Sequence, residues 1–136
     1  MGEYVSGECL CGQIEFSGES EIKRIANCHC TDCQKITGAA FATIIFVDES
    51  QIKIRGKLKV FEHHSDKGSK LTKYFCPNCG SQMFCKNLRR PGVIGLRAGS
   101  LDQKSLIKPE INVYIDSKIQ STPINEKLAV FNKMSS

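Results

Sequence analysis

Three cysteines stand within six residues in the stretch CHCTDCQK, at positions 28, 30 and 33. If the chain is extended up to Cys30, the side chains of Cys28 and Cys30 point to the same side, because side chains alternate along a strand. If a helical turn begins at Thr31, Cys33 returns to that side about three residues later. The three cysteines can therefore bind one metal ion. Three protein ligands with an open fourth position are typical of catalytic zinc.

A fourth ligand from elsewhere would close this site, and five residues are candidates. His29 lies between two of the cysteines and should point away from them, and Asp32 is expected to cap a helix or face solvent. His63 and His64 end a predicted strand before a polar turn, which favours surface exposure. Cys85 fits a strand that packs cysteine as a small apolar residue. We therefore expect an open site, with closure by Cys85 or a histidine as the alternative.

Four further cysteines form a second set, made of a C-x-C-G pair and a C-P-x-C-G pair about 65 residues apart. The proline and the trailing glycines let the backbone turn tightly enough for both sulfurs of a pair to reach one ion. Four thiolates complete a tetrahedral structural zinc site, which would tie distant parts of the chain together. A redox dithiol is the alternative for the second pair alone. The predicted structural ligands are Cys9, Cys11, Cys76 and Cys79.

The three-cysteine site favours chemistry on a thiol over hydrolysis. Three thiolates and one Zn²⁺ leave a net negative charge, so the metal would be a weak activator of water. It would still bind an incoming thiol and favour its thiolate form. Binding adds a second negative charge, so a nearby cation would help. Lys35, two residues after the last cysteine, is the candidate on the substrate side.

Composition limits the class of protein. We expect one zinc-binding domain over residues 1–136, which is long enough to bury its own core. The eight cysteines could form four disulfides, but no secretion signal is evident, so a reducing cytoplasmic location and metal binding are favoured. No apolar run is long enough to span a membrane.

Nucleic acid is not an expected partner. Seven metal-bound thiolates and two zinc ions would lower the formal charge of +5 to about +2. The basic stretch at residues 86–92 lacks interleaved aromatic side chains that could stack on bases.

Short β-rich runs separated by turn signals predict a mainly β fold of two or more small antiparallel sheets. Alternation is clear at residues 57–61 and 111–115, where the apolar side chains fall on one face. The one expected helix is a turn or two around Thr31 to Ile36. The predicted strands are 13–18, 22–28, 41–47, 51–56, 58–64, 70–76, 81–86, 93–99 and 111–116.

Taken together, four segments resemble the glutathione-dependent formaldehyde-activating enzyme family. They are the C-x-C-G pair, CHCTDCQKITGAAF at 28–41, CPNCG at 76–80 and LRAGSLD at 96–102, and the likeness covers residues from about 5 to 118. The resemblance implies a zinc-pinned β-tent with a short helix after the CHCxxC motif. It also implies a structural zinc on Cys9, Cys11, Cys76 and Cys79 and a catalytic zinc on Cys28, Cys30 and Cys33.

The activity implied by the resemblance is that of a carbon–sulfur lyase. Such an enzyme condenses formaldehyde with glutathione to S-(hydroxymethyl)glutathione, or cleaves that adduct. Two alternatives stay open: an enzyme for another small thiol or aldehyde, and a non-catalytic zinc module that binds a protein partner. The chain departs from the family in lacking tryptophan near its C-terminal strand, where Tyr114 stands, and its tail beyond Lys118 follows no family pattern.

Overall fold

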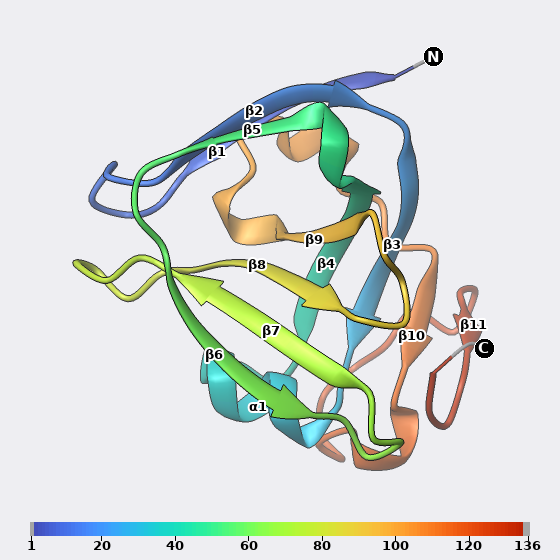
Figure 1. The fold of residues 1–136 in the computed structure, drawn as a ribbon. Helices are drawn as coiled ribbons and strands as arrows, with labels where there is room; N and C mark the ends of the chain where they lie inside the picture. Colours follow the sequence, from blue (N-terminus) through green and yellow to red (C-terminus); the bar gives the residue numbers. More distant parts are fainter. Residues whose placement is uncertain (1, 135–136) are drawn as a thin grey trace.

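The computed structural model describes residues 2–134, which form two β-sheets and a short α-helix (Figure 1). The smaller sheet has the order β1-β2-β5 and is antiparallel. The larger sheet has eight strands in the order β11-β10-β3-β4-β9-β8-β7-β6. None of the helices in the described part is long and apolar enough to cross a membrane.

The strands are β1 (Glu3–Glu8), β2 (Glu15–Ser20), β3 (Ile22–Cys28), β4 (Ala42–Asp48), β5 (Ile52–Arg55), β6 (Lys59–His64), β7 (Lys70–Phe75), β8 (Gln82–Asn87), β9 (Val93–Arg97), β10 (Ile111–Val113) and β11 (Ala129–Val130). The helix α1 is Thr31–Thr37, and short 3₁₀ turns occupy Glu49–Gln51, Ala98–Ser100, Lys104–Leu106 and Ile115–Ser117.

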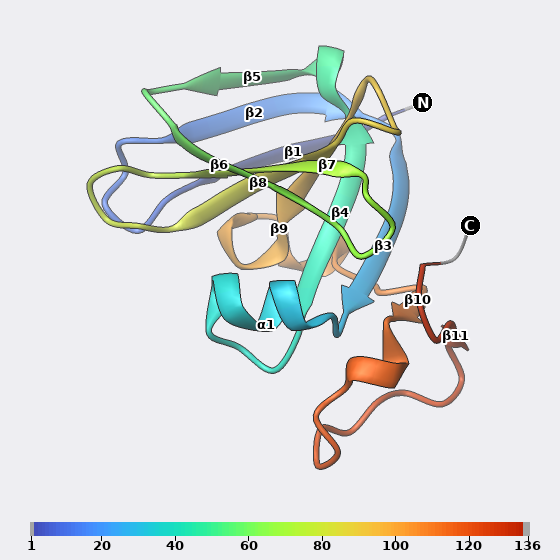
Figure 2. The ribbon, with the colours of Figure 1, turned by 60° about the horizontal axis from the view of Figure 1, so that its bottom comes forward.

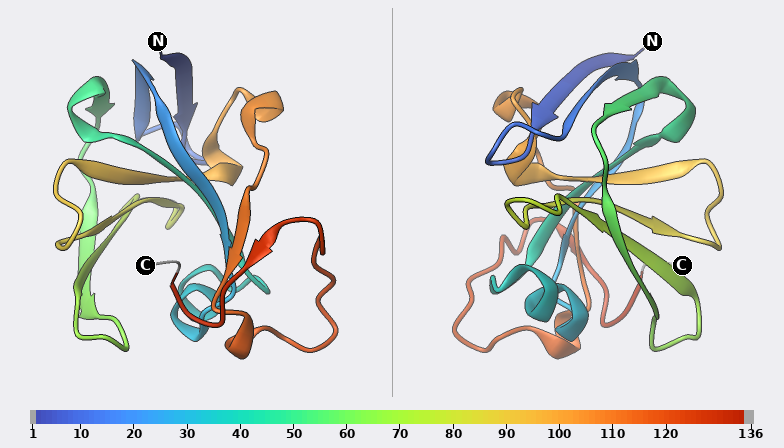
Figure 3. Two further views of the ribbon diagram at one scale, coloured as in Figure 1. Left: turned by 90° about the vertical axis from the view of Figure 1, so that its right-hand side faces the viewer. Right: turned by 60° about the vertical axis from the view of Figure 1, so that its left-hand side comes forward.

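The predicted mainly β fold with one short helix around Thr31 to Ile36 is confirmed, with two differences. Strand β10 pairs in parallel with β3, and β11 pairs in parallel with β10, whereas only antiparallel pairing was predicted. Figure 3 shows the C-terminal segment folding back beside β10. Strands β1 and β11 were missed. In β1 only Val5 marks an inner apolar face, and Gly7 beside it is small because the Phe16 ring and the Ser100 carbonyl occupy the space of a side chain.

The main core lies where the small sheet covers one face of the large sheet. Phe16 of β2 meets Phe84 of β8 edge to face, with ring centroids 5.5 Å apart. Ile45 and Leu96, which pair across β4 and β9, are fully buried in the same cluster. Each large apolar side chain buried in this way contributes roughly 1.5–3 kcal/mol.

The opposite face of the large sheet carries the helix. Figure 2 shows α1 on the far side of the sheet from β1, β2 and β5. A second cluster of buried residues fills this side and includes Cys28, Cys33, Ile44 and Cys85. Gly95 on β9 lies between Ile44 and Cys85. A Cβ atom at this position would stand 2.6 Å from Cγ2 of Ile44 and 2.7 Å from Sγ of Cys85.

We predict that Gly95→Ala lowers the free energy of unfolding by about 1–3 kcal/mol, because the added methyl group overpacks the sheet. Gly99→Ala is the matched control, since nothing lies within 4 Å of its Cβ position, and it should change the stability by less than about 0.5 kcal/mol. Urea unfolding of the reduced, zinc-loaded proteins measures both. Equal stabilities for the two variants would contradict the packing described.

Candidate metal centres and their pocket

The first cysteine cluster joins the start of the chain to the turn between β7 and β8. The sulfur atoms of Cys9, Cys11, Cys76 and Cys79 all lie within 4.8 Å of one another. The Cys9 and Cys11 sulfurs are 3.6 Å apart, and those of Cys11 and Cys76 are 3.7 Å apart. The structure thus brings together the four predicted structural ligands, and four sulfurs at this spacing could hold a tetrahedral metal ion.

Backbone geometry makes this convergence possible. Gly12 and Gly80, which follow the two pairs, have φ angles of 82° and 78°, in the left-handed region that favours glycine. Each turn also directs an amide toward a sulfur: Ile14 N–H donates to Cys9 Sγ at 3.3 Å, and Cys79 N–H donates to Cys76 Sγ at 3.5 Å. Hydrogen bonds of this kind stabilise thiolates.

Hydrogen bonds lower the pKa of two of these thiols and so favour their thiolate form. Hydrogen bonds from the side chain and backbone of Ser81 lower the pKa of Cys79 to about 5. A hydrogen bond with the Asn78 side chain is the largest cause lowering the pKa of Cys11. Thiolates are the form that binds metal.

The second cluster forms where β3 passes into α1. Cys28 is the last residue of β3, and Cys30 has an extended backbone, with φ −65° and ψ 153°. Cys30 is the N-cap of the helix that begins at Thr31, and its sulfur accepts a hydrogen bond from the Cys33 N–H at 3.2 Å. The sulfur atoms of Cys28, Cys30 and Cys33 lie within 4.8 Å of one another. The change from strand to helix therefore produces the convergence that the spacing predicts.

The pKa values of the cysteines in this triplet are shifted in different directions. Hydrogen bonds from Cys28 and Cys30 are the main causes that lower the pKa of Cys33, and the positive charges of Lys73 and Arg97 add to them. The pKa of Cys28 is raised, chiefly by its hydrogen bonds with Cys30 and Cys33. The lowered pKa of Cys33 favours its thiolate form, which is the form that binds metal.

None of the five candidate fourth ligands joins the triplet. No further His, Cys, Asp or Glu within residues 2–134 has a ligand atom within 4.8 Å of all three sulfurs. His29 is buried against the Phe41 ring, and its Nε2 lies 3.2 Å from Oδ1 of Asn112. Cys85 is buried in β8, as its strand pattern predicts, and His64 is exposed.

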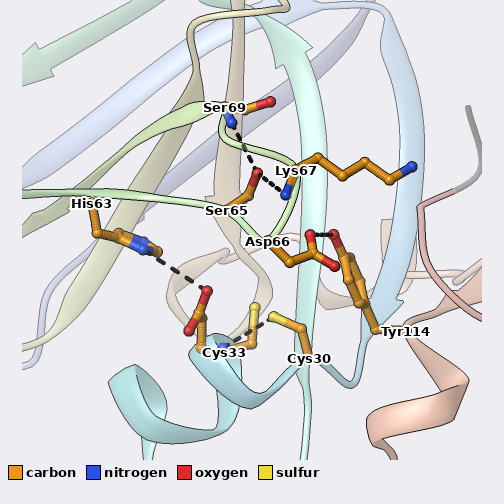
Figure 4. Close-up of polar contacts among 9 residues, drawn as sticks. Cys30, Cys33, His63, Ser65, Asp66, Lys67, Ser69 and Tyr114 are labelled. Carbon is orange, nitrogen blue, oxygen red and sulfur yellow. Dashed lines mark hydrogen bonds and ion pairs between the residues drawn. The ribbon is translucent and has the colours of Figure 1, made fainter.

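His63 is mostly buried, whereas the sequence favoured its exposure at the surface. Its side chain is only 19% exposed, and Nδ1 lies 3.9 Å from Oδ2 of the half-exposed Asp32 in the first turn of α1. Burial is the main cause that lowers the pKa of His63, and the charge of Lys73 lowers it further. Nε2 of His63 is buried without a hydrogen-bond partner among the described residues. Figure 4 shows this imidazole directed toward the carboxylate beside Cys33.

A pocket of about 520 Å³ opens over the triplet and is lined by all three cysteines. One wall is the hairpin between β6 and β7, where Ser65 Oγ accepts hydrogen bonds from the N–H groups of Lys67 and Ser69 (Figure 4). The Tyr114 hydroxyl donates to Oδ1 of Asp66 in this hairpin at 3.0 Å. Tyr114 has a φ of 59°, a conformation uncommon outside glycine, and it packs in the buried cluster around the cysteines.

The pocket lining is strongly basic. Among residues 2–134, only two carboxylates line the pocket, those of Asp32 and Asp66. Apolar side chains such as Ile44, Leu71 and Val113 form much of the remaining surface. Lys35, the predicted substrate-side cation, is exposed on α1 and is not among the lining residues, so its role stays a prediction. The cationic lining residues are Arg24, Lys67, Lys73, Lys86, Arg89, Arg90 and Lys133.

Comparisons with known proteins identify the family of this chain and a similar fold. A sequence model of the family described as glutathione-dependent formaldehyde-activating enzyme matches residues 4–117, the span that contains both cysteine clusters. The fold is similar to that of a Rhodobacter sphaeroides protein known from a crystal structure, with a TM-score of 0.57 and 20% sequence identity over 76% of this chain and 96% of that one. The chain therefore belongs to the glutathione-dependent formaldehyde-activating enzyme family.

Proposed function

We propose that this protein is a cytoplasmic, zinc-dependent carbon–sulfur lyase that forms or cleaves S-(hydroxymethyl)glutathione from glutathione and formaldehyde. The proposal places two zinc ions in one domain. A structural ion would be held by Cys9, Cys11, Cys76 and Cys79, and a second by Cys28, Cys30 and Cys33. The observation that carries it is the convergence of three sulfurs, without a fourth protein ligand among residues 2–134, in the lining of a 520 Å³ pocket.

The cysteines fit zinc by their chemistry. All eight are free thiols, so no disulfide competes for the sulfurs of either cluster. The lowered pKa values of Cys33 and Cys79 supply a thiolate in each cluster. Zinc bound at the triplet would favour the thiolate form of an incoming thiol.

The pocket residues suit a peptide thiol such as glutathione, which carries two carboxylates. The basic lining can bind those carboxylates, while the apolar part of the wall packs against methylene groups. In the reaction the sulfur forms a bond to the carbon of formaldehyde, and the π electron pair of the C=O bond moves to oxygen, leaving a C–O single bond. The proton of the thiol is finally carried by that oxygen, and cleavage is the reverse.

We predict that Cys28→Ser leaves one zinc ion per chain while Cys85→Ser leaves two. Both residues are buried in the same cluster, but only Cys28 has its sulfur near two others. Elemental analysis of reduced, desalted protein measures the zinc content, and far-UV circular dichroism checks that each variant is folded. Loss of one zinc in Cys85→Ser would contradict the open site and favour a closed, non-catalytic zinc module.

We predict that glutathione binds the two-zinc protein and that S-methylglutathione, which lacks the free thiol, binds at least about tenfold more weakly. Isothermal titration calorimetry measures both, with Cys28→Ser as the control that should lose the difference. Exchange of formaldehyde with glutathione, followed by NMR, should then be faster with the wild type than with Cys28→Ser.

Equal binding of the two peptides would overturn the assignment of the thiol to the three-cysteine site. Absence of glutathione binding, with both zinc ions present, would move the search to other small thiols.

A further inference from the structure

Two cations are buried on the face of the large sheet that carries the triplet. Lys73 of β7 is 5% exposed and Arg97 of β9 is 6% exposed. Among residues 2–134, neither forms an ion pair with a carboxylate. All three guanidinium nitrogens of Arg97 are buried without a hydrogen-bond partner in this part of the chain. A buried charge without a partner is costly, so its presence calls for a counter-charge.

The strand register places Lys73 and Arg97 on the face of the sheet that carries the cysteines. Lys73 pairs with Cys85, and Cys85 pairs with Gly95, which is two residues before Arg97. On the other side of β9, Arg97 pairs with Ile44 of β4. Directly paired residues and residues two apart on a strand share a face.

The same face extends to the second cysteine cluster. Ala42, two residues before Ile44, pairs with Cys28. Lys73 lines the pocket together with all three cysteines. Arg97 is not among the lining residues but shares the face through its pairing with Ile44. The cysteines, which bind metal as thiolates, are therefore groups on this face whose negative charge the two cations can balance.

The balance of charge predicts what the site accepts. Three thiolates with one Zn²⁺ carry one net negative charge, and two buried cations convert this to one net positive charge. An anionic ligand then makes the site neutral, whereas a neutral ligand leaves a buried surplus charge. Asp32 does not alter the balance of the interior, because it is half-exposed and lies against His63.

We propose that Lys73 and Arg97 are specificity-determining residues, whose fixed positive charges select an anionic over a neutral ligand at the open side of the three-cysteine site. This inference rests on the metal site of the proposed function but does not depend on glutathione or formaldehyde. It assigns the charge compensation that the sequence suggests for Lys35 to two residues that are distant in sequence.

Cobalt-loaded protein provides the test, because the visible absorption of Co²⁺ reports ligand binding without any turnover. Azide is the anionic probe and imidazole the neutral one, each titrated into the wild type and into Lys73→Met and Arg97→Met. Lys70→Met is the matched control, because Lys70 lies on the same strand as Lys73 but is exposed, is paired with Glu62 at 3.1 Å and is not among the pocket-lining residues. Lys73→Arg tests rescue by a residue that keeps the charge.

We predict that Lys73→Met and Arg97→Met each weaken azide binding by at least about tenfold, as expected for the loss of a nearby buried charge. The affinity for imidazole should stay within about twofold of that of the wild type. Lys70→Met and Lys73→Arg, which keep the charge at position 73, should both bind azide like the wild type. The two substitutions are made separately, so either folded variant decides the question.

Unchanged azide affinity in the variants, a parallel loss of azide and imidazole binding, or failure of the wild type to bind azide would each overturn the proposal. A wild type that binds azide in the predicted way but does not bind glutathione would refute the glutathione assignment alone.

Discussion

The convergence of three sulfurs at the end of β3 depends on one local change of backbone conformation. Cys28 ends a strand, Cys30 is extended and caps the helix, and Cys33 lies in the first turn of α1. The Cys33 N–H donates to the Cys30 sulfur, so the helix N-terminus itself orders the cluster. Strand β3 is held on both sides, by β4 and β10, which fixes the position of Cys28 relative to the rest of the sheet.

The remaining structure supplies the surroundings that this cluster needs. The four-cysteine cluster lies where the segment after β1 meets the turn before β8. Strands β7 and β9 then bring Lys73 and Arg97 to the same face as the triplet, and the hairpin after β6 meets Tyr114 over the pocket. The two buried cations thus come from the sheet, whereas the three cysteines come from the junction of strand and helix.

Local features of this site were predictable from the sequence and long-range features were not. The spacing of Cys28, Cys30 and Cys33 determines their convergence, because strand and helix periods act over only a few residues. Lys35 is near the triplet in sequence, but its side chain is exposed. Lys73 and Arg97 are about 40 and 64 residues away from Cys33 in sequence. Strand register brings them to the same face of the sheet, and the sequence pattern does not determine that register. His63 was expected at the surface because a polar turn follows it, but the folded β6–β7 hairpin places it beside Asp32 of α1.

X-ray absorption at the zinc edge shows most directly whether one of two bound metal ions has only three protein ligands. On reduced protein with two zinc ions per chain and no added thiol, we expect an average of about 3.5 sulfur ligands per zinc, completed by a light atom from solvent. Four sulfurs per zinc, or the scattering pattern of a bound imidazole, would show a closed second site and contradict the account.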